Sequence, residues 1–527
     1  MSISAGRLPW IDGAVLAAYL VVIISIGLSF YRRKSDVREY FVASRQLPMP
    51  IVVMGLAAAL LSGISYLGVP SYSFRVDIVP AATLLAAPLA FFIVSRALLP
   101  FFFKLEVVTA YEYLERRFGP SVRLLASVLF LASRMLWLTL VSYGPAVALK
   151  TILPISPPAP VEAAFRWLHI DPAIGFWVFA IGLAGTIYTM VGGMRAVMWT
   201  DSIQFVILFA GLVGMLWLAV HRSGASLSQV WEIAHRAGRT RLFNFAFSWT
   251  EGTFWAAITG GLFLTLGDFG TDQLAVQRYL AAKSMKEAQG SAMLSLVVNV
   301  PIMLILYAAG FVLFVFYSLR PNPELAALMQ KTPDVLLPWF YRYEMPPGVA
   351  GLMLGTILTA TMSCLTAGIN SLSASTSIDL YQARFAQRAS SSELVRFGRR
   401  ATVVWGAVIS IAAAYVGNLG AGLMELSWIL LGLSATLNIG IFLCAIFLPR
   451  VGTAALWCGI TAGAVVSTII VVLGFHWLWY YSLGALSMML VASSAAILLP
   501  HPQQSATEGL TYWSRARQMQ PAERSFQ

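Results

Sequence analysis

The chain has 527 residues, of which 58% are hydrophobic and only 11% are charged. A soluble domain carries about 25% charged residues, so this sequence has too little polar surface for a water-soluble enzyme. The net charge of +12 does not indicate nucleic-acid binding, because the basic residues lie between apolar runs and are better explained by membrane orientation.

Apolar runs recur from one end of the chain to the other, each long enough for one bilayer crossing of about 20 residues. They cover residues 11–30, 50–74, 79–103, 121–150, 172–192, 199–220, 252–274, 291–318, 348–377, 401–418, 423–448, 453–474 and 478–499. The sequence therefore predicts an all-α, polytopic membrane protein with about 13 transmembrane helices.

The loops between these runs differ in charge. If the N-terminus lies outside, most of the 35 lysine and arginine residues fall in the loops on the cytoplasmic side and in the tail. Cytoplasmic loops carry such an excess in membrane proteins. We therefore predict a multi-pass protein of the plasma (inner) membrane, with the N-terminus outside and the C-terminus in the cytoplasm.

Two runs contain residues that are unfavourable inside a helix. In the first run they are Gly55, Ser62, Gly63, Gly68 and Pro70, and in the second they are Gly260, Gly261, Gly267 and Gly270. Irregular backbone at membrane depth is tolerated only where it is buried in protein or lines a cavity. We expect a broken helix in each run, although glycines can also serve only to let helices pack closely.

Each broken run opens a block of five crossings. This arrangement predicts an inverted five-plus-five helix repeat, with broken first and sixth repeat helices and the binding site at the two breaks. The expected units are an N-terminal helix and loop at 1–49, repeats at 50–222 and 252–448, an outside loop at 223–251, two extra helices at 449–500 and a cytoplasmic tail at 501–527.

Several segments resemble the sodium:solute symporter family. They are KS at 34–35, EYFVASR at 39–45, VTAYEYLERRFG at 108–119, GGMRAVMWTDSIQ at 192–204, GTDQLAVQRYLAAKSMKEAQ at 270–289 and INSLSASTSIDLY at 369–381. The resemblance implies a leucine-transporter-type fold, alternating access, and a sodium ion between the first and eighth repeat helices. LGVPSYSFR at 67–75 and GTDQ at 270–273 look closest to the branches that carry monocarboxylates, iodide, vitamins and sialic acid.

The resemblance also implies a set of sodium ligands. Ala58, Leu61 and Ala360 would supply main-chain carbonyl groups, and Ser363 would supply a hydroxyl. A helix break that frees carbonyl oxygens suits a hard cation such as sodium. Cys364 stands where the family usually has a second serine or threonine, and its soft sulfur is a weak ligand for sodium.

A second ion site is also implied by the resemblance. In some relatives an aspartate matching Asp201 works with hydroxyls that correspond here to Ser363 and Thr366, while Ala367 lacks the last hydroxyl. The alternative for Asp201 is structural, as a cap of a helix start or a partner of Arg195.

Arg134 lies near the middle of the run 121–150, too far from either surface to extend its charge into water. A charged side chain there should face the interior of the bundle and have an anionic partner. Because guanidinium binds carboxylates through two parallel hydrogen bonds, we expect a carboxylate of the solute as the partner. The alternative is an internal acid such as Asp268.

Other candidate solute-binding residues gather at the two breaks. Ser62 and Ser65 lie on one face of the first broken helix, since they are three residues apart. The full set predicted to bind solute is Ser62, Ser65, Arg134, Thr265, Asp268, Phe269 and Asn299. Asp272 and Gln273 are expected instead to hold the end of their helix by hydrogen bonds.

Together these features predict a secondary active transporter that couples inward sodium movement to uptake of a small organic solute. We expect this solute to be a carboxylate, either a monocarboxylate or a sialic acid-like acid. The sequence contains no phosphate-binding loop, and we do not expect an enzyme. The expected partners are the solute and the lipid bilayer, and neither nucleic acid nor an obligatory protein partner is expected. The alternative is proton-coupled or sodium-independent transport of a neutral sugar, polyol or amino acid, which Cys364 leaves open.

Overall fold

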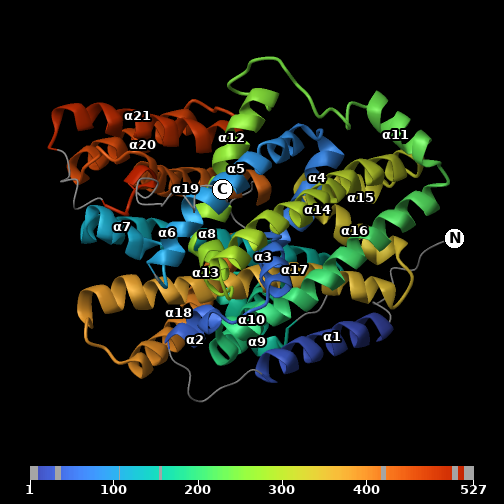
Figure 1. Cartoon of the computed structure of the whole chain (residues 1–527). Helices are drawn as coiled ribbons and strands as arrows, with labels where there is room; N and C mark the ends of the chain where they lie inside the picture. Colours follow the sequence, from blue (N-terminus) through green and yellow to red (C-terminus); the bar gives the residue numbers. More distant parts are fainter. Residues whose placement is uncertain are drawn as a thin grey trace.

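The computed structural model describes residues 10–29, 37–105, 107–152, 157–416, 423–500 and 508–514. These residues form helices joined by short connections, with one isolated β-bridge between Leu47 and Ala282. In Figure 1, α20 (Thr453–Val472) and α21 (Tyr480–Leu498) lie at one edge of the bundle and α1 (Trp10–Ser29) lies at the opposite edge. Residues 1–9, the predicted loop residues 30–36 and most of the predicted tail lie outside the described residues.

The helices up to the first third of the chain are α2 (Val37–Val42), α3 (Met49–Leu60), α4 (Gly63–Arg75), α5 (Ala87–Ile93), α6 (Leu99–Lys104), α7 (Tyr111–Phe118), α8 (Pro120–Ile152) and α9 (Ala159–Trp167). The middle of the chain forms α10 (Pro172–Ser223), α11 (Leu227–Arg236), α12 (Phe254–Leu266), α13 (Gln273–Leu280), α14 (Met285–Leu319), α15 (Pro323–Lys331) and α16 (Leu336–Glu344). The last helices before α20 are α17 (Val349–Ser375), α18 (Ser391–Tyr415) and α19 (Leu423–Phe447).

Within the described residues, seven helices are long and apolar enough to cross a membrane, and nine crossings result if each of two bent helix pairs counts as one. The chain is therefore a multi-pass membrane protein. Residues 172–223 differ from the expectation of two separate runs, because α10 continues through the predicted loop around Arg195. Two parts of this helix are apolar enough to belong to membrane crossings, namely Met194–Ser223 and, in a bent pair with Ala159–Trp167, Pro172–Ile187.

The first predicted break is confirmed. Helix α3 ends at Leu60 and α4 begins at Gly63, with a bend of 57° between them. Leu61 has φ −84° and ψ 85°, which is not helical. Ser62 then caps α4, because its Oγ accepts a hydrogen bond from Ser65 N at 3.2 Å.

The second break lies at the end of its run. Helix α12 is regular through Gly260 and Gly261, continues into a π-helical turn over Gly267–Thr271, and is interrupted at Asp272 before α13. Gly260 and Gly261 serve close packing instead, since a Cβ on Gly260 would overlap the carbonyl of Leu478 and one on Gly261 would lie 2.7 Å from Thr83 Cα.

Helix α17 runs through the centre of the bundle and packs against α3, α4, α8 and α10. At the first break the approach is very close, because a Cβ on Gly63 would lie 2.7 Å from Thr361 Oγ1. Glycine is therefore needed at this position for packing. The packing places residues 58–65 beside the segment of α17 that contains the predicted ion ligands.

Candidate functional site

A cavity of about 200 Å³ lies between the two breaks. It is bounded by α4, α8, the end of α12, α14, α19 and α21. Six of the seven residues predicted to bind solute line it, namely Ser65, Arg134, Thr265, Asp268, Phe269 and Asn299. Residues far apart in sequence thus converge on one enclosed space, as the arrangement of the two broken helices predicts.

Ser62 is the exception. It is fully buried and caps α4, and it lies beside Ser65, with 3.3 Å between the two hydroxyl oxygens. Ser62 therefore orients the start of α4 and the Ser65 side chain, while Ser65 faces the cavity.

Arg134 projects from α8 and forms an ion pair with Asp272 at the second break. The internal acid paired with the guanidinium is therefore Asp272, whereas Asp268 was the internal partner considered from the sequence. Asp272 also caps α13, since its Oδ1 accepts from Leu274 N at 2.8 Å. One carboxylate thus ties the start of α13 to α8 and leaves Arg134 on the cavity wall.

The neighbouring Gln273 holds the same helix end, as predicted. Its Oε1 accepts from Ala110 N at 2.8 Å, and its Nε2 donates to Val108 O at 3.0 Å. Phe269 is fixed by packing, because its ring centroid lies 4.4 Å from that of Phe91. The second break is therefore held from several sides, and its polar groups have defined positions.

Asn438 on α19 lines the same cavity and was not among the residues selected from the sequence. It is buried, and its Oδ1 has no hydrogen-bond partner within the described part of the chain. The sequence did carry a signal, since an amide inside the apolar run 423–448 is unfavourable unless it faces protein or a cavity.

The predicted ion ligands lie where α17 meets the first break. Among the described residues, the last recorded backbone bond of α3 is from Leu61 N to Ala57 O at 3.1 Å, and no amide is recorded on the Ala58 or Leu61 carbonyl. Ser363 Oγ is buried, lies beside the Asp201 carboxylate, and makes no hydrogen bond of normal geometry. Unpaired oxygens of this kind suit a hard cation.

The two residues after Ser363 differ in what they offer. Cys364 is buried beside Trp137 and Arg134, so it lies between the ion ligands and the solute cavity. Thr366 uses its hydroxyl within its own helix, because Oγ1 donates to Met362 O at 2.8 Å and to Ser363 O at 3.2 Å.

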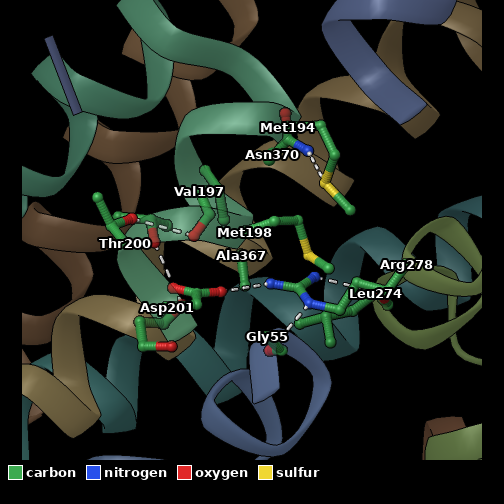
Figure 2. A network of polar contacts seen from close by, with 12 residues as sticks. Gly55, Met194, Val197, Met198, Thr200, Asp201, Leu274, Arg278, Ala367 and Asn370 are labelled. Carbon is green, nitrogen blue, oxygen red and sulfur yellow. Dashed lines mark hydrogen bonds and ion pairs between the residues drawn. The ribbon is translucent and has the colours of Figure 1, made fainter. Parts of the chain in front are cut away.

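Asp201 is fully buried and forms an ion pair with Arg278, with 2.9 Å between Oδ2 and Nη2 (Figure 2). Arg278 also donates to Gly55 O and Leu274 O, both at 3.3 Å. Asp201 is inside α10 and not at a helix start. The Arg195 side chain, the other structural partner considered for Asp201, pairs instead with Glu39 at 3.1 Å.

Comparison with known proteins agrees with this architecture. The family model described as "Sodium:solute symporter family" matches residues 40–463. The sodium/sialic acid symporter NanT of Aliivibrio fischeri is 29% identical over 485 residues, which cover 90% of this chain and 91% of that protein. The human sodium/iodide cotransporter is 30% identical over 466 residues, covering 86% of this chain and 69% of that protein.

The solved structures point the same way. A substrate-bound, outward-open sodium-coupled sialic acid symporter superposes with a TM-score of 0.83 at 25% identity, covering 94% of this chain and 99% of that chain. A nucleobase-cation-symport-1 family transporter superposes with a TM-score of 0.54 at 14% identity, covering 91% and 99% of the two chains. The second likeness concerns the fold alone.

Proposed function

This chain belongs to the sodium:solute symporter family and is a sodium-coupled transporter of a small solute, and we propose that the solute is a carboxylate bound through Arg134. The observation that carries the proposal is a guanidinium on the wall of an enclosed cavity between two broken helices. Guanidinium recognises carboxylates by paired hydrogen bonds. The named relatives include symporters of sialic acid, which is such an acid.

The size of the cavity favours a small solute. A cavity of about 200 Å³ with a few polar groups on its wall suits a small organic acid. Ser65, Thr265 and Asn299 would orient the remainder of the solute by hydrogen bonds, and Phe269 would cover it.

The coupling sodium is assigned to the junction of the first break and α17. The carbonyl groups of Ala58, Leu61 and Ala360 and the Ser363 hydroxyl would hold it, with Cys364 as a weak fifth neighbour. The support is that, within the described residues, Ser363 Oγ is buried beside the Asp201 carboxylate without a hydrogen bond of normal geometry, and that the break packs directly on α17. Sodium at this position would fix the break that also carries Ser65, so each ligand favours binding of the other.

A second sodium is assigned to Asp201, Ser363 and Thr366, and its site is the weaker of the two. Arg278 already compensates the Asp201 carboxylate, and the Thr366 hydroxyl is bound to backbone. Asp201 Oδ1 is the atom left for an ion, because it is buried and, among the described residues, makes no hydrogen bond of normal geometry.

Transport would follow alternating access within an inverted five-plus-five repeat at 50–222 and 252–448, flanked by the units at 1–49, 223–251, 449–500 and 501–527. The broken helices α3/α4 and α12/α13 would open these two repeats, in agreement with the observed breaks. Orientation in a plasma (inner) membrane, with the N-terminus outside, follows from the charge of the loops.

Uptake by proteoliposomes tests this function. Labelled small carboxylates should accumulate when a sodium gradient is imposed and not when choline replaces sodium. Arg134→Lys keeps the charge but removes the two-pronged geometry, so it should reduce uptake, as should Arg134→Gln. Equal uptake in choline, or uptake driven equally by a pH gradient, would contradict sodium coupling. Unchanged uptake in Arg134→Gln would contradict carboxylate recognition by this residue.

A further inference from the structure

The solute cavity contains one more carboxylate than its guanidinium can neutralise. Arg134 already pairs with Asp272, and Asp268 lines the same cavity. Within the described ranges, Asp268 makes no hydrogen bond or ion pair, and it interacts at longer range with Arg134, Asp272 and Tyr481. A charge at membrane depth is unfavourable unless an opposite charge or hydrogen-bond donors compensate it. Asp268 is therefore a position at which a cationic group that enters the cavity would be stabilised.

A second acceptor faces the cavity from another helix. Asn438 Oδ1 is unpaired in the described structure, and the residue is only 7% exposed. Buried acceptors are almost always paired in folded proteins. Asp268 from the second break and Asn438 from α19 therefore present two acceptors that lack donors, both on the wall of one cavity.

Arg134 is the cationic donor among the described residues that line this cavity, beside neutral donors such as Ser65 and Thr265. A guanidinium has five N–H groups, and within the described structure only Nη2 has a recorded hydrogen bond, to Asp272. The remaining N–H groups are free to bind a solute carboxylate. The cavity thus offers donors at Arg134 and acceptors at Asp268 and Asn438, a pattern complementary to a molecule that carries charges of both signs.

We propose that the transported solute is a small zwitterion, whose carboxylate binds Arg134 and whose ammonium group binds Asp268 and Asn438. This inference rests on the proposed function and narrows its solute class. An ammonium group supplies three donors and pairs with Asp268, while the carboxylate of the same solute pairs with Arg134, so a zwitterion adds no net charge to the cavity. A plain monocarboxylate would instead add a second negative charge beside Asp268, which is unfavourable in a site of low dielectric constant.

Matched ligand pairs test this proposal with the purified full-length chain in detergent and sodium. The amino members are glycine, β-alanine and γ-aminobutyrate, and the matched acids are acetate, propionate and butyrate. Binding is measured by thermal shift and by isothermal titration. Charge-assisted hydrogen bonds predict that at least one amino member binds about 10- to 100-fold more tightly than its matched acid.

Two cavity variants and one control sharpen the test. Asp268→Asn should weaken the amino ligand by about 10- to 100-fold and should improve binding of the matched acid, since the like charge is gone. Asn438→Ala should weaken the amino ligand by several-fold to about 10-fold. Glu162→Gln removes a carboxylate from α9, away from the cavity, and should leave both affinities unchanged. If a cavity variant does not fold, the affinities of the wild-type protein for the amino ligands and for the matched acids decide whether the solute is a zwitterion.

Three results would overturn the zwitterion. Matched acids that bind the wild type as tightly as the amino ligands, with Asp268→Asn changing neither, would do so and leave carboxylate transport intact. If the matched acids bind more tightly as the pH is lowered, a proton neutralises Asp268 when the solute binds, and no ammonium group is needed. Binding by neither series, in sodium, would overturn the proposed carboxylate function as well.

Discussion

Breaking the ion pair between Asp201 and Arg278 should strongly destabilise the protein. The two side chains are 0% and 1% exposed and 2.9 Å apart, and Arg278 joins α13 to α3 through Gly55 O. Removing one partner of a buried pair leaves the other charge uncompensated, which costs about 3–5 kcal/mol. We therefore expect Asp201→Asn and Arg278→Met each to lower the free energy of unfolding by about 3–5 kcal/mol.

The double variant separates pairing from simple loss of a side chain. With both charges absent, the loss should be about 2–4 kcal/mol smaller than the sum of the two single losses. Unfolding in mixed micelles, followed by circular dichroism, measures these free energies. Arg166→Gln is the control, because its pair with Glu162 is exposed and worth only about 0.3–0.5 kcal/mol. Additive losses, or single losses below about 1 kcal/mol, would refute a buried, charged pair.

Three further outcomes are expected. Gly260→Ala should lose about 2–3 kcal/mol of stability in a denaturation assay, because its Cβ would overlap the Leu478 carbonyl, whereas Gly214→Ala, with open space around it, should lose nothing. Cys364→Ser should lower the sodium concentration for half-maximal uptake, while Cys444→Ser should not, and no difference between them would remove residue 364 from the ion site. Burial lowers the pKa of His476 from about 6.5 to about 4, so the folded state keeps the ring neutral while the unfolded state gains a proton first. Stability should therefore fall by up to about 3 kcal/mol as the pH drops from 6.5 to 4, and His476→Gln should abolish this dependence in pH-resolved melting curves.

Local rules identified the first break because several signals coincide there. A serine before a glycine is a good start for a helix, and a helix cannot continue unbroken through such a site at low cost. The structure accordingly ends α3 at Leu60 and starts α4 after Ser62. In the second run, only some of the glycines lie at the break, because the helix is regular through Gly260 and Gly261. Gly260 and Gly261 meet Leu478 and Thr83, which are distant in sequence, so no local signal separates packing glycines from breaking ones.

The same limit explains the partner of Arg134. Sequence position indicates that a buried guanidinium needs an anion, but it does not say which of two acids four residues apart will face it. The choice depends on the π-helical turn at Gly267–Thr271, which adds backbone between Asp268 and the start of α13 and turns Asp272 toward α8. A regular helix would place Asp268 and Asp272 on one face. Around the irregular turn, Asp272 pairs with Arg134, whereas Asp268 makes no ion pair with any described residue, so the two acids have different roles: one holds the guanidinium, and the other could pair with a cationic group of the solute.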